Sequence, residues 1–250
     1  MQPWEIALDI FLKEWDKKEY FVGALLCGSH AVGTANSLSD VDLHIILSDK
    51  IDWRERGNKT VNGIQIEYFV NPKHKIREYL KEQYAWNSYI TVRMFATGKV
   101  VRDPHGEIKK LKQWAAHEVN RKFKKMTKSN IELEKYHLWY ILDNLKDLHF
   151  HNSLGFIFLY HNALDKAFHV YAEYLQMEIH SEAKLYKYLS SDQYRHKYKM
   201  PAFPDKKFTD LFIDALRKQN FPHIQKLLNH VILKMGGLKV ENWKLRTKVK

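Results

Sequence analysis

Two aspartates of this chain have the types and spacing for metal-dependent phosphate chemistry. Asp40 and Asp42 flank a valine in the run Ser-Asp-Val-Asp-Leu. The alternation of a β-strand puts both carboxylates on one face. Adjacent anions repel unless a divalent cation lies between them, and carboxylate oxygens are ligands that Mg²⁺ prefers. The pair therefore predicts a metal site.

A third carboxylate, Glu67, lies in an alternating segment and shares its strand face with Gln65 and Phe69. If this strand lies beside that of Asp42, the three carboxylates form one site. Two metal ions about 4 Å apart could then clamp the attacking and leaving oxygens of an in-line displacement. Mg²⁺ is the expected ion, with Mn²⁺ as the alternative.

The pair Gly28-Ser29 directly follows a predicted buried strand. Glycine permits a tight turn, which lets backbone N–H groups and the serine hydroxyl face an anion. The pair therefore predicts a phosphate-binding turn. Ser39, the neighbour of Asp40, is a further candidate for contact with a nucleotide.

Together, residues 28–33 (Gly-Ser-His-Ala-Val-Gly) and 37–43 (Ser-Leu-Ser-Asp-Val-Asp-Leu) resemble the signature of the polymerase-beta-like nucleotidyltransferases. The chain is similar to the bacterial aminoglycoside- and lincosamide-type members, which modify antibiotics. The resemblance implies transfer of a nucleoside monophosphate, usually AMP from ATP, to a hydroxyl, with release of pyrophosphate. It assigns Asp40 and Asp42 to the metal and Gly28-Ser29 to the triphosphate. Glu67 is either a metal ligand or a general base. The motif covers residues 20–70, and beyond residue 103 the resemblance is only architectural.

Hydrophobic periodicity predicts the elements that must position these residues. A helix over the first fifteen residues precedes strands at 20–27, 41–47 and 60–70, the last with a turn or bulge at Asn62-Gly63. A helix at 73–97 and a short strand at 99–102 follow. Beyond Pro104 the pattern predicts helices at about 107–126, 129–149, 153–178, 181–190 and 207–235. We expect an α+β chain: a small mixed-sheet nucleotidyltransferase domain with flanking helices at 1–104, and an α-helical bundle domain at 105–250 that binds the acceptor.

Charge is divided unevenly along the chain. Residues 1–104 hold 14 Lys and Arg against 14 Asp and Glu, whereas residues 105–250 hold 27 against 15. The net charge of +12 therefore belongs to the second part. This excess favours an anionic partner such as RNA, or it marks a solvated basic helix surface. It argues against a polycationic antibiotic.

The leading hypothesis is an enzyme that acts on a small hydroxyl-bearing acceptor, with ATP as the nucleotide. Candidate acceptor contacts are His44, on the strand face of Asp42, and Tyr140 with Asp143 on one helix face. The competing interpretation of His44 is a histidine that is hydrogen-bonded within the sheet. The competing interpretation of Tyr140 and Asp143 is a solvent-exposed helix face. The alternative functions are nucleotidyl transfer to RNA, tRNA or a protein, and a catalytically silent nucleotide-binding module.

The sequence also predicts where the protein resides. Its apolar runs fall far short of the roughly 18 to 20 residues that span a bilayer. The N-terminal residues include acidic side chains where a signal peptide would be basic. We expect a cytoplasmic protein with no membrane partner, and a mobile basic tail over residues 239–250.

Overall fold

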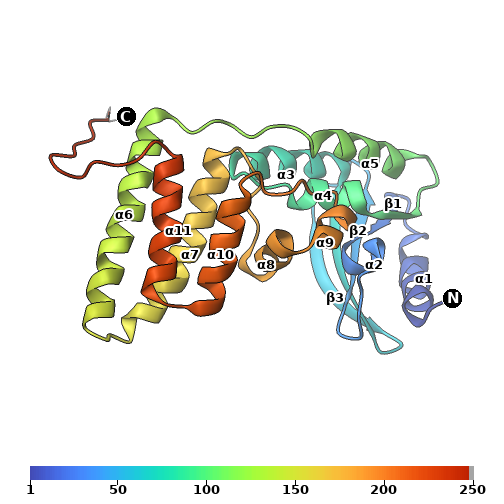
Figure 1. Cartoon of the computed structure of the whole chain (residues 1–250). Helices are drawn as coiled ribbons and strands as arrows, with labels where there is room; N and C mark the ends of the chain where they lie inside the picture. Colours follow the sequence, from blue (N-terminus) through green and yellow to red (C-terminus); the bar gives the residue numbers. More distant parts are fainter. Residues whose placement is uncertain (248–250) are drawn as a thin grey trace. The chain divides into compact units, whose positions relative to one another are not determined.

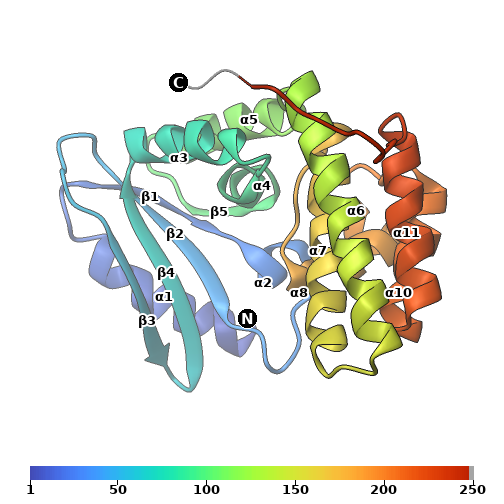
Figure 2. The ribbon, with the colours of Figure 1, turned by 90° about the vertical axis from the view of Figure 1, so that its left-hand side faces the viewer.

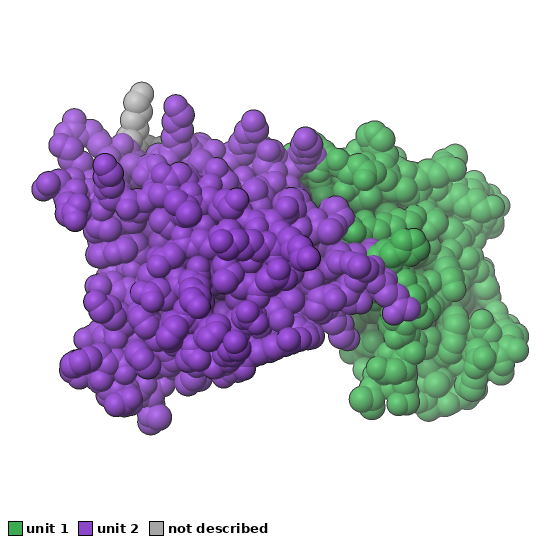
Figure 3. Space-filling view, viewed as in Figure 1, with its two compact units in different colours: residues 1–121, 196–200 green, residues 122–195, 201–250 purple. Residues whose placement is uncertain are grey.

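The computed structural model describes residues 1–247, which form two compact units. Unit 1 comprises Met1–Arg121 together with His196–Met200, and unit 2 comprises Lys122–Arg195 and the chain from Pro201 onward (Figure 3). Helix α5 (Glu107–Glu118) therefore belongs to unit 1, whereas the sequence pattern placed the end of the first domain at residue 104. Helix α5 packs on the sheet of unit 1, because its buried Ile108 lies closely against Gly23 in one of the strands.

A five-stranded mixed sheet forms the centre of unit 1, with the strand order β3-β4-β2-β1-β5. The strands are β1 (Phe21–Leu26), β2 (Val41–Leu47), β3 (Glu55–Val61), β4 (Ile64–Pro72) and β5 (Lys99–Arg102). Strands β2 and β4 run parallel, and the other neighbours run antiparallel. The predicted α+β class is confirmed.

Helices cover both faces of this sheet (Figures 1 and 2). Helix α1 (Pro3–Trp15) packs on one face, and α3 (Lys73–Ala85), α4 (Ile90–Thr97) and α5 pack on the other. Because side chains alternate along a strand, β2 sends Val41, Leu43 and Ile45 into the core with α1. Asp42 and His44 therefore point to the opposite face.

The hairpin β3–β4 corrects the prediction of a single strand at 60–70. Asn62 and Gly63 have positive φ angles of 50° and 79° and form a two-residue turn, the geometry that hairpins favour. Strand β3 is polar and mostly exposed, so no apolar alternation indicates it. It forms by pairing with β4, from Glu55 opposite Val70 to Val61 opposite Ile64.

Two helices that the periodicity predicted as continuous are each divided by a residue with a left-handed backbone. In the helix expected at 73–97, α3 ends at Ala85, and Asn87 (φ 51°) precedes α4. In the helix expected at 207–235, Gln219 (φ 45°) ends α10, and the Asn220 side chain caps α11. Periodicity alone does not register these breaks, because the apolar spacing resumes after each turn.

Unit 2 is a helical bundle, as predicted. Its helices are α6 (Lys128–Phe150), α7 (Gly155–Tyr174), α8 (Glu182–Ser190), α10 (Lys206–Lys218) and α11 (Phe221–Lys234), and α9 (Asp192–Lys197) crosses the boundary between the units. Asp205 caps α10 and accepts a hydrogen bond from the Tyr171 hydroxyl at 2.7 Å. His230 Nε2 lies 2.8 Å from the same carboxylate. Asp205 therefore joins α7, α10 and α11.

Part of the basic end is packed on this bundle, contrary to the prediction of a mobile tail from residue 239. Trp243 stacks on Tyr136 of α6, with ring centroids 4.1 Å apart. Residues 248–250 of the predicted tail lie outside the described residues. Within the described chain, none of the helices combines the length and the apolar character that crossing a membrane requires.

Candidate metal and phosphate site

Three carboxylates converge where β2 begins. The parallel register pairs Asp42 of β2 directly with Glu67 of β4, and Asp40 immediately precedes β2. One carboxylate oxygen from each residue lies within 4.8 Å of the other two. All three residues are half-buried. Hard oxygen donors at this separation suit a divalent cation. The sequence left the pairing of these two strands as a condition, and the structure meets it. The metal remains a prediction.

Gly28 lies directly against the Asp42 carboxylate. Its φ is +62°, a left-handed conformation that side-chain-bearing residues rarely adopt. A Cβ built on Gly28 would lie 1.8 Å from Asp42 Oδ2. Just before the turn, the Cys27 N–H donates to the Asp42 carbonyl at 2.8 Å. A glycine is therefore required here, both for the backbone turn and for the close approach of the carboxylate.

The glycine turn leads into the short helix α2 (Gly28–Val32), which ends at Gly33 in a left-handed conformation. The backbone carbonyl of Ser29 accepts hydrogen bonds from the N–H groups of Gly33 and Thr34. Among the described residues, none forms a hydrogen bond with the Ser29 hydroxyl, which belongs to a half-buried residue. That hydroxyl therefore has its hydrogen-bonding capacity available for a ligand.

Ser39, in contrast, stabilises its own loop. Its Oγ accepts a hydrogen bond from the Asn36 N–H at 3.0 Å and lies 3.3 Å from Asn36 Oδ1. These bonds fix the chain immediately before Asp40. The predicted contact of Ser39 with a nucleotide remains a prediction.

Sequence reasoning missed one charged residue of the site, Arg56 on β3. Its Nη2 donates to Glu67 Oε1 at 2.6 Å, and its guanidinium lies 4.8 Å from the ring centre of Phe69. The Arg56 side chain is 70% exposed, against 21% for Glu67. A cross-strand ion pair becomes visible only when both strands and their register are known, and β3 gave no apolar signal.

A lysine from far along the sequence contacts the end of helix α2. Lys197 Nζ donates to the Gly33 carbonyl at 2.8 Å, at the end of the helix that begins with the glycine turn. The buried Arg93 holds this segment by donating to the carbonyls of Tyr198 (3.0 Å) and Lys199 (2.9 Å). Lys197 therefore belongs to unit 1, although it lies more than 150 residues beyond the motif and no local sequence pattern indicates its position.

His44 is buried in the sheet and does not line the site. It is 4% exposed, stacks on Phe69 and contacts Phe95, with both ring-centroid distances at 5.1 Å. Burial lowers the pKa of His44 to about 4, so the imidazole is neutral near pH 7. In the described part of the chain, neither ring nitrogen has a hydrogen-bond partner. The histidine is therefore within the sheet, but without the hydrogen bonds expected of it there.

Tyr140 and Asp143 lie on α6 of unit 2, and both side chains are exposed. They share a helix face, as the spacing predicted. They form no part of the carboxylate cluster. Their contact with an acceptor remains a prediction.

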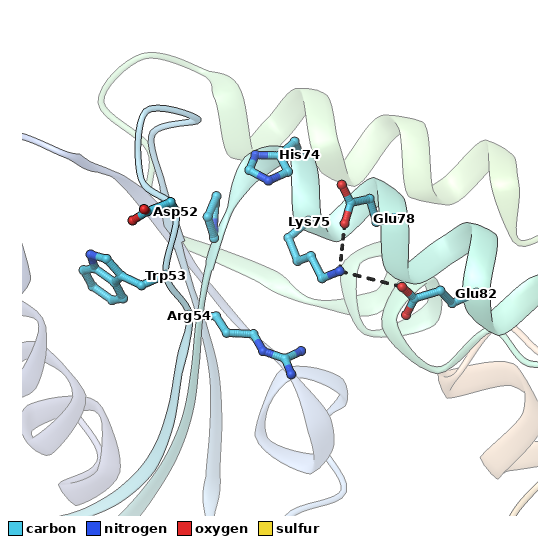
Figure 4. Close-up of a pocket in the computed structure, with 8 residues that line it drawn as sticks. Asp52, Trp53, Arg54, His74, Lys75, Glu78 and Glu82 are labelled. Atoms are coloured by element: carbon cyan, nitrogen blue, oxygen red, sulfur yellow. Dashed lines mark hydrogen bonds and ion pairs between the residues drawn. The ribbon is translucent and has the colours of Figure 1, made fainter.

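A cavity of about 540 Å³ lies at the other end of the strands (Figure 4). It is bounded by Pro72, the register partner of Leu47 at the end of β2, and by the first turns of α3. Three of its charged side chains pair with one another: Lys75 Nζ lies 2.7 Å from Glu78 and 3.7 Å from Glu82. Figure 4 shows both carboxylates turned toward this lysine. Because a lysine already pairs with its two glutamates, this cavity is a weaker candidate for a metal site than the carboxylate cluster.

Comparison with known proteins does not place the chain in a family. No family model matches it, and no curated protein matches it significantly. Among solved structures, the chain is similar to a nucleotidyltransferase-like protein from Exiguobacterium sibiricum. The identity is 12% and the TM-score 0.42, over 93% of this chain and 77% of that chain. A likeness of this degree carries no argument, so the functional conclusion rests on the residues of the site.

Proposed function

We propose that the protein is a Mg²⁺-dependent nucleotidyltransferase that transfers AMP from ATP to a hydroxyl of a small acceptor and releases pyrophosphate. One observation carries the proposal: Asp40, Asp42 and Glu67 bring carboxylate oxygens within 4.8 Å of one another. The glycine turn at Gly28, which closes on Asp42, supports it.

The three carboxylates would hold two Mg²⁺ ions, with Mn²⁺ as the alternative. The bound metal would neutralise charge on the phosphates and activate the attacking oxygen. The Gly28-Ser29 turn offers backbone N–H groups and a hydroxyl to the triphosphate, and Lys197 adds a cation at the end of α2. In the transfer, the acceptor oxygen bonds to the α-phosphorus while the bond to pyrophosphate breaks. The acceptor proton passes to Glu67 or to water.

We assign recognition of the acceptor to unit 2, with Tyr140 and Asp143 as the candidate contacts. Unit 2 (residues 122–195 and 201–250) holds 21 basic against 13 acidic side chains, which opposes a polycation. A neutral or anionic molecule that carries hydroxyl groups fits this charge better, and antibiotics of that kind are among the candidates.

The test is incubation with α-labelled ATP, Mg²⁺ and a panel of lincosamides, aminoglycosides, tRNA and proteins, with detection of pyrophosphate and labelled product. We expect a small hydroxyl-bearing acceptor to be labelled, and labelling to disappear in Asp42→Asn. Asp49→Asn removes a carboxylate just beyond the other end of β2 and should retain activity. Labelling of tRNA or of a protein would show that the acceptor is not a small molecule. Full activity in Asp42→Asn would contradict the proposed metal site.

A further inference from the structure

The ion pair between Arg56 and Glu67 places a permanent cation on a carboxylate of the cluster. Arg56 Nη2 lies 2.6 Å from Glu67 Oε1, and Glu67 also supplies an oxygen within 4.8 Å of Asp40 and Asp42. The guanidinium therefore partly balances a group of three anions that would otherwise repel one another. A divalent cation entering the cluster must compete with Arg56 for Glu67.

Arg56 is held weakly enough to lose this competition. Its side chain is 70% exposed on β3, which is an edge strand of the sheet (Figure 2). Exposed ion pairs contribute little to stability, because water screens them and long side chains lose freedom. A divalent ion coordinated by three carboxylates interacts more strongly than that. The exchange is therefore favourable.

Arg56 remains near the site after it leaves Glu67. Its guanidinium lies 4.8 Å from the centre of the Phe69 ring, a cation–π contact that does not depend on Glu67. A phosphate bound to a metal at this cluster would lie within reach of that side chain. The planar fork of an arginine matches two phosphate oxygens, and such charge-assisted hydrogen bonds are strong.

We propose that Arg56 is an exchangeable counter-ion: it neutralises Glu67 before metal binds, gives way to the metal, and then donates its N–H groups to the phosphates of the nucleotide and of pyrophosphate. This inference rests on the proposed function, because it takes the cluster to be the metal site. Under it, Arg56 is a catalytic residue that contacts the leaving group.

The chain offers a matched control in Lys59, which lies on the same strand but on the opposite face. Lys59 Nζ contacts Glu14 of α1 at 2.7 Å. Lys59→Ala removes the same charge from the hairpin without touching Glu67. Arg56→Lys keeps the charge and removes the planar fork. Circular dichroism of each variant verifies that it is folded.

The experiment measures Mn²⁺ affinity by electron paramagnetic resonance, and pyrophosphate affinity by calorimetry at saturating Mn²⁺. We expect Arg56→Ala to bind Mn²⁺ about two- to fivefold more tightly, since a competing cation is gone. The same variant should bind pyrophosphate about tenfold more weakly. Lys59→Ala should match the wild type in both measurements. Arg56→Lys should bind pyrophosphate more weakly than the wild type.

Each contrary result has a distinct meaning. Unchanged or weaker Mn²⁺ binding in Arg56→Ala overturns the exchange, and so do equal effects in Arg56→Ala and Lys59→Ala. Tighter Mn²⁺ binding with unchanged pyrophosphate binding overturns the phosphate contact. Failure of the proposed function gives a different result. In that case the wild-type protein binds no Mn²⁺, and its Mn²⁺ titration does not differ from that of Asp42→Asn.

Discussion

Asp42 of β2 is the direct register partner of Glu67 of β4 in the parallel strand pair. This pairing joins two motifs that are separate in the sequence into one cluster, and it makes both carboxylates candidates for holding a metal. The contribution of each carboxylate can be measured without knowledge of the acceptor.

Glu67→Gln is expected to weaken Mn²⁺ binding at least about tenfold, because it removes a charged oxygen donor from the cluster. Titration followed by electron paramagnetic resonance gives the dissociation constant. Asp49→Asn, which removes a carboxylate hydrogen-bonded to the His74 N–H at 2.6 Å, should bind Mn²⁺ as the wild type does. Unchanged Mn²⁺ affinity in Glu67→Gln, together with lost transfer activity, would assign Glu67 the role of general base instead.

Comparison of Gly28→Ala with Gly33→Ala distinguishes the cost of a positive φ from the cost of a steric clash with the Asp42 carboxylate. Both glycines have positive φ, but a Cβ on Gly28 meets Asp42 Oδ2 at 1.8 Å, whereas a Cβ on Gly33 meets nothing within 4 Å. Gly33→Ala should therefore lower the free energy of unfolding by about 1 kcal/mol and leave Mn²⁺ affinity intact. Gly28→Ala should destabilise more and weaken Mn²⁺ binding. Urea unfolding and Mn²⁺ titration measure both effects, and equal losses in the two variants would contradict the close approach.

His44→Phe is expected to raise the free energy of unfolding by about 1 kcal/mol at pH 8. The substitution removes two buried ring nitrogens that lack partners and keeps an aromatic ring beside Phe69 and Phe95. His44→Ala, which leaves a cavity, should destabilise by on the order of 3 kcal/mol. Urea unfolding curves decide the matter. If the phenylalanine variant loses as much stability as the alanine variant, the imidazole makes a necessary hydrogen bond.

Asp205→Asn should remove an acid-sensitive part of the stability of unit 2. Burial alone would raise the pKa of Asp205, but hydrogen bonds from the Phe208 N–H, the Tyr171 hydroxyl and His230 outweigh it and lower the pKa to about 2. Because this value lies below the ordinary 3.8, the ionised carboxylate contributes roughly 2 kcal/mol. That contribution is present above pH 3.8 and is lost as the pH falls through 2.

Urea unfolding at pH 7, 4 and 2.5 follows this contribution. Asp205→Asn should be less stable than the wild type by roughly 2 kcal/mol at pH 7, and the difference should shrink as the pH is lowered from 4 to 2.5. A constant difference over that range would show that the effect of the substitution does not arise from the charge of Asp205.

The parts of the fold that bury apolar side chains were predictable from the sequence. Strands β2 and β5 have the predicted bounds, since apolar residues and flanking turn residues mark them. Strand β3 escaped prediction because its residues Glu55–Val61 are polar and exposed, so their strand conformation depends on pairing with β4. Missing β3 also meant missing Arg56.

The candidate site shows the same division. The strand alternation alone put Asp40 and Asp42 on one face, and the resemblance to the nucleotidyltransferase signature joined Gly28 to them. Glu67 joins the site only if its strand lies beside that of Asp42, and the sequence did not determine the order of the strands. Lys197 could not be foreseen, because it reaches unit 1 through a return of the chain that no local pattern encodes.

That return determines how the protein can be divided. The chain passes between the units after Arg121, after Arg195 and after Met200. A fragment that ends at Arg121 would lack two carbonyls that accept hydrogen bonds from the buried Arg93 guanidinium. Unfolding of unit 2 would likewise destabilise the segment His196–Met200, which supplies these two carbonyls and is flanked in the sequence by parts of unit 2. We therefore expect the unfolding of the two compact units to be coupled, and calorimetry should record one joint transition.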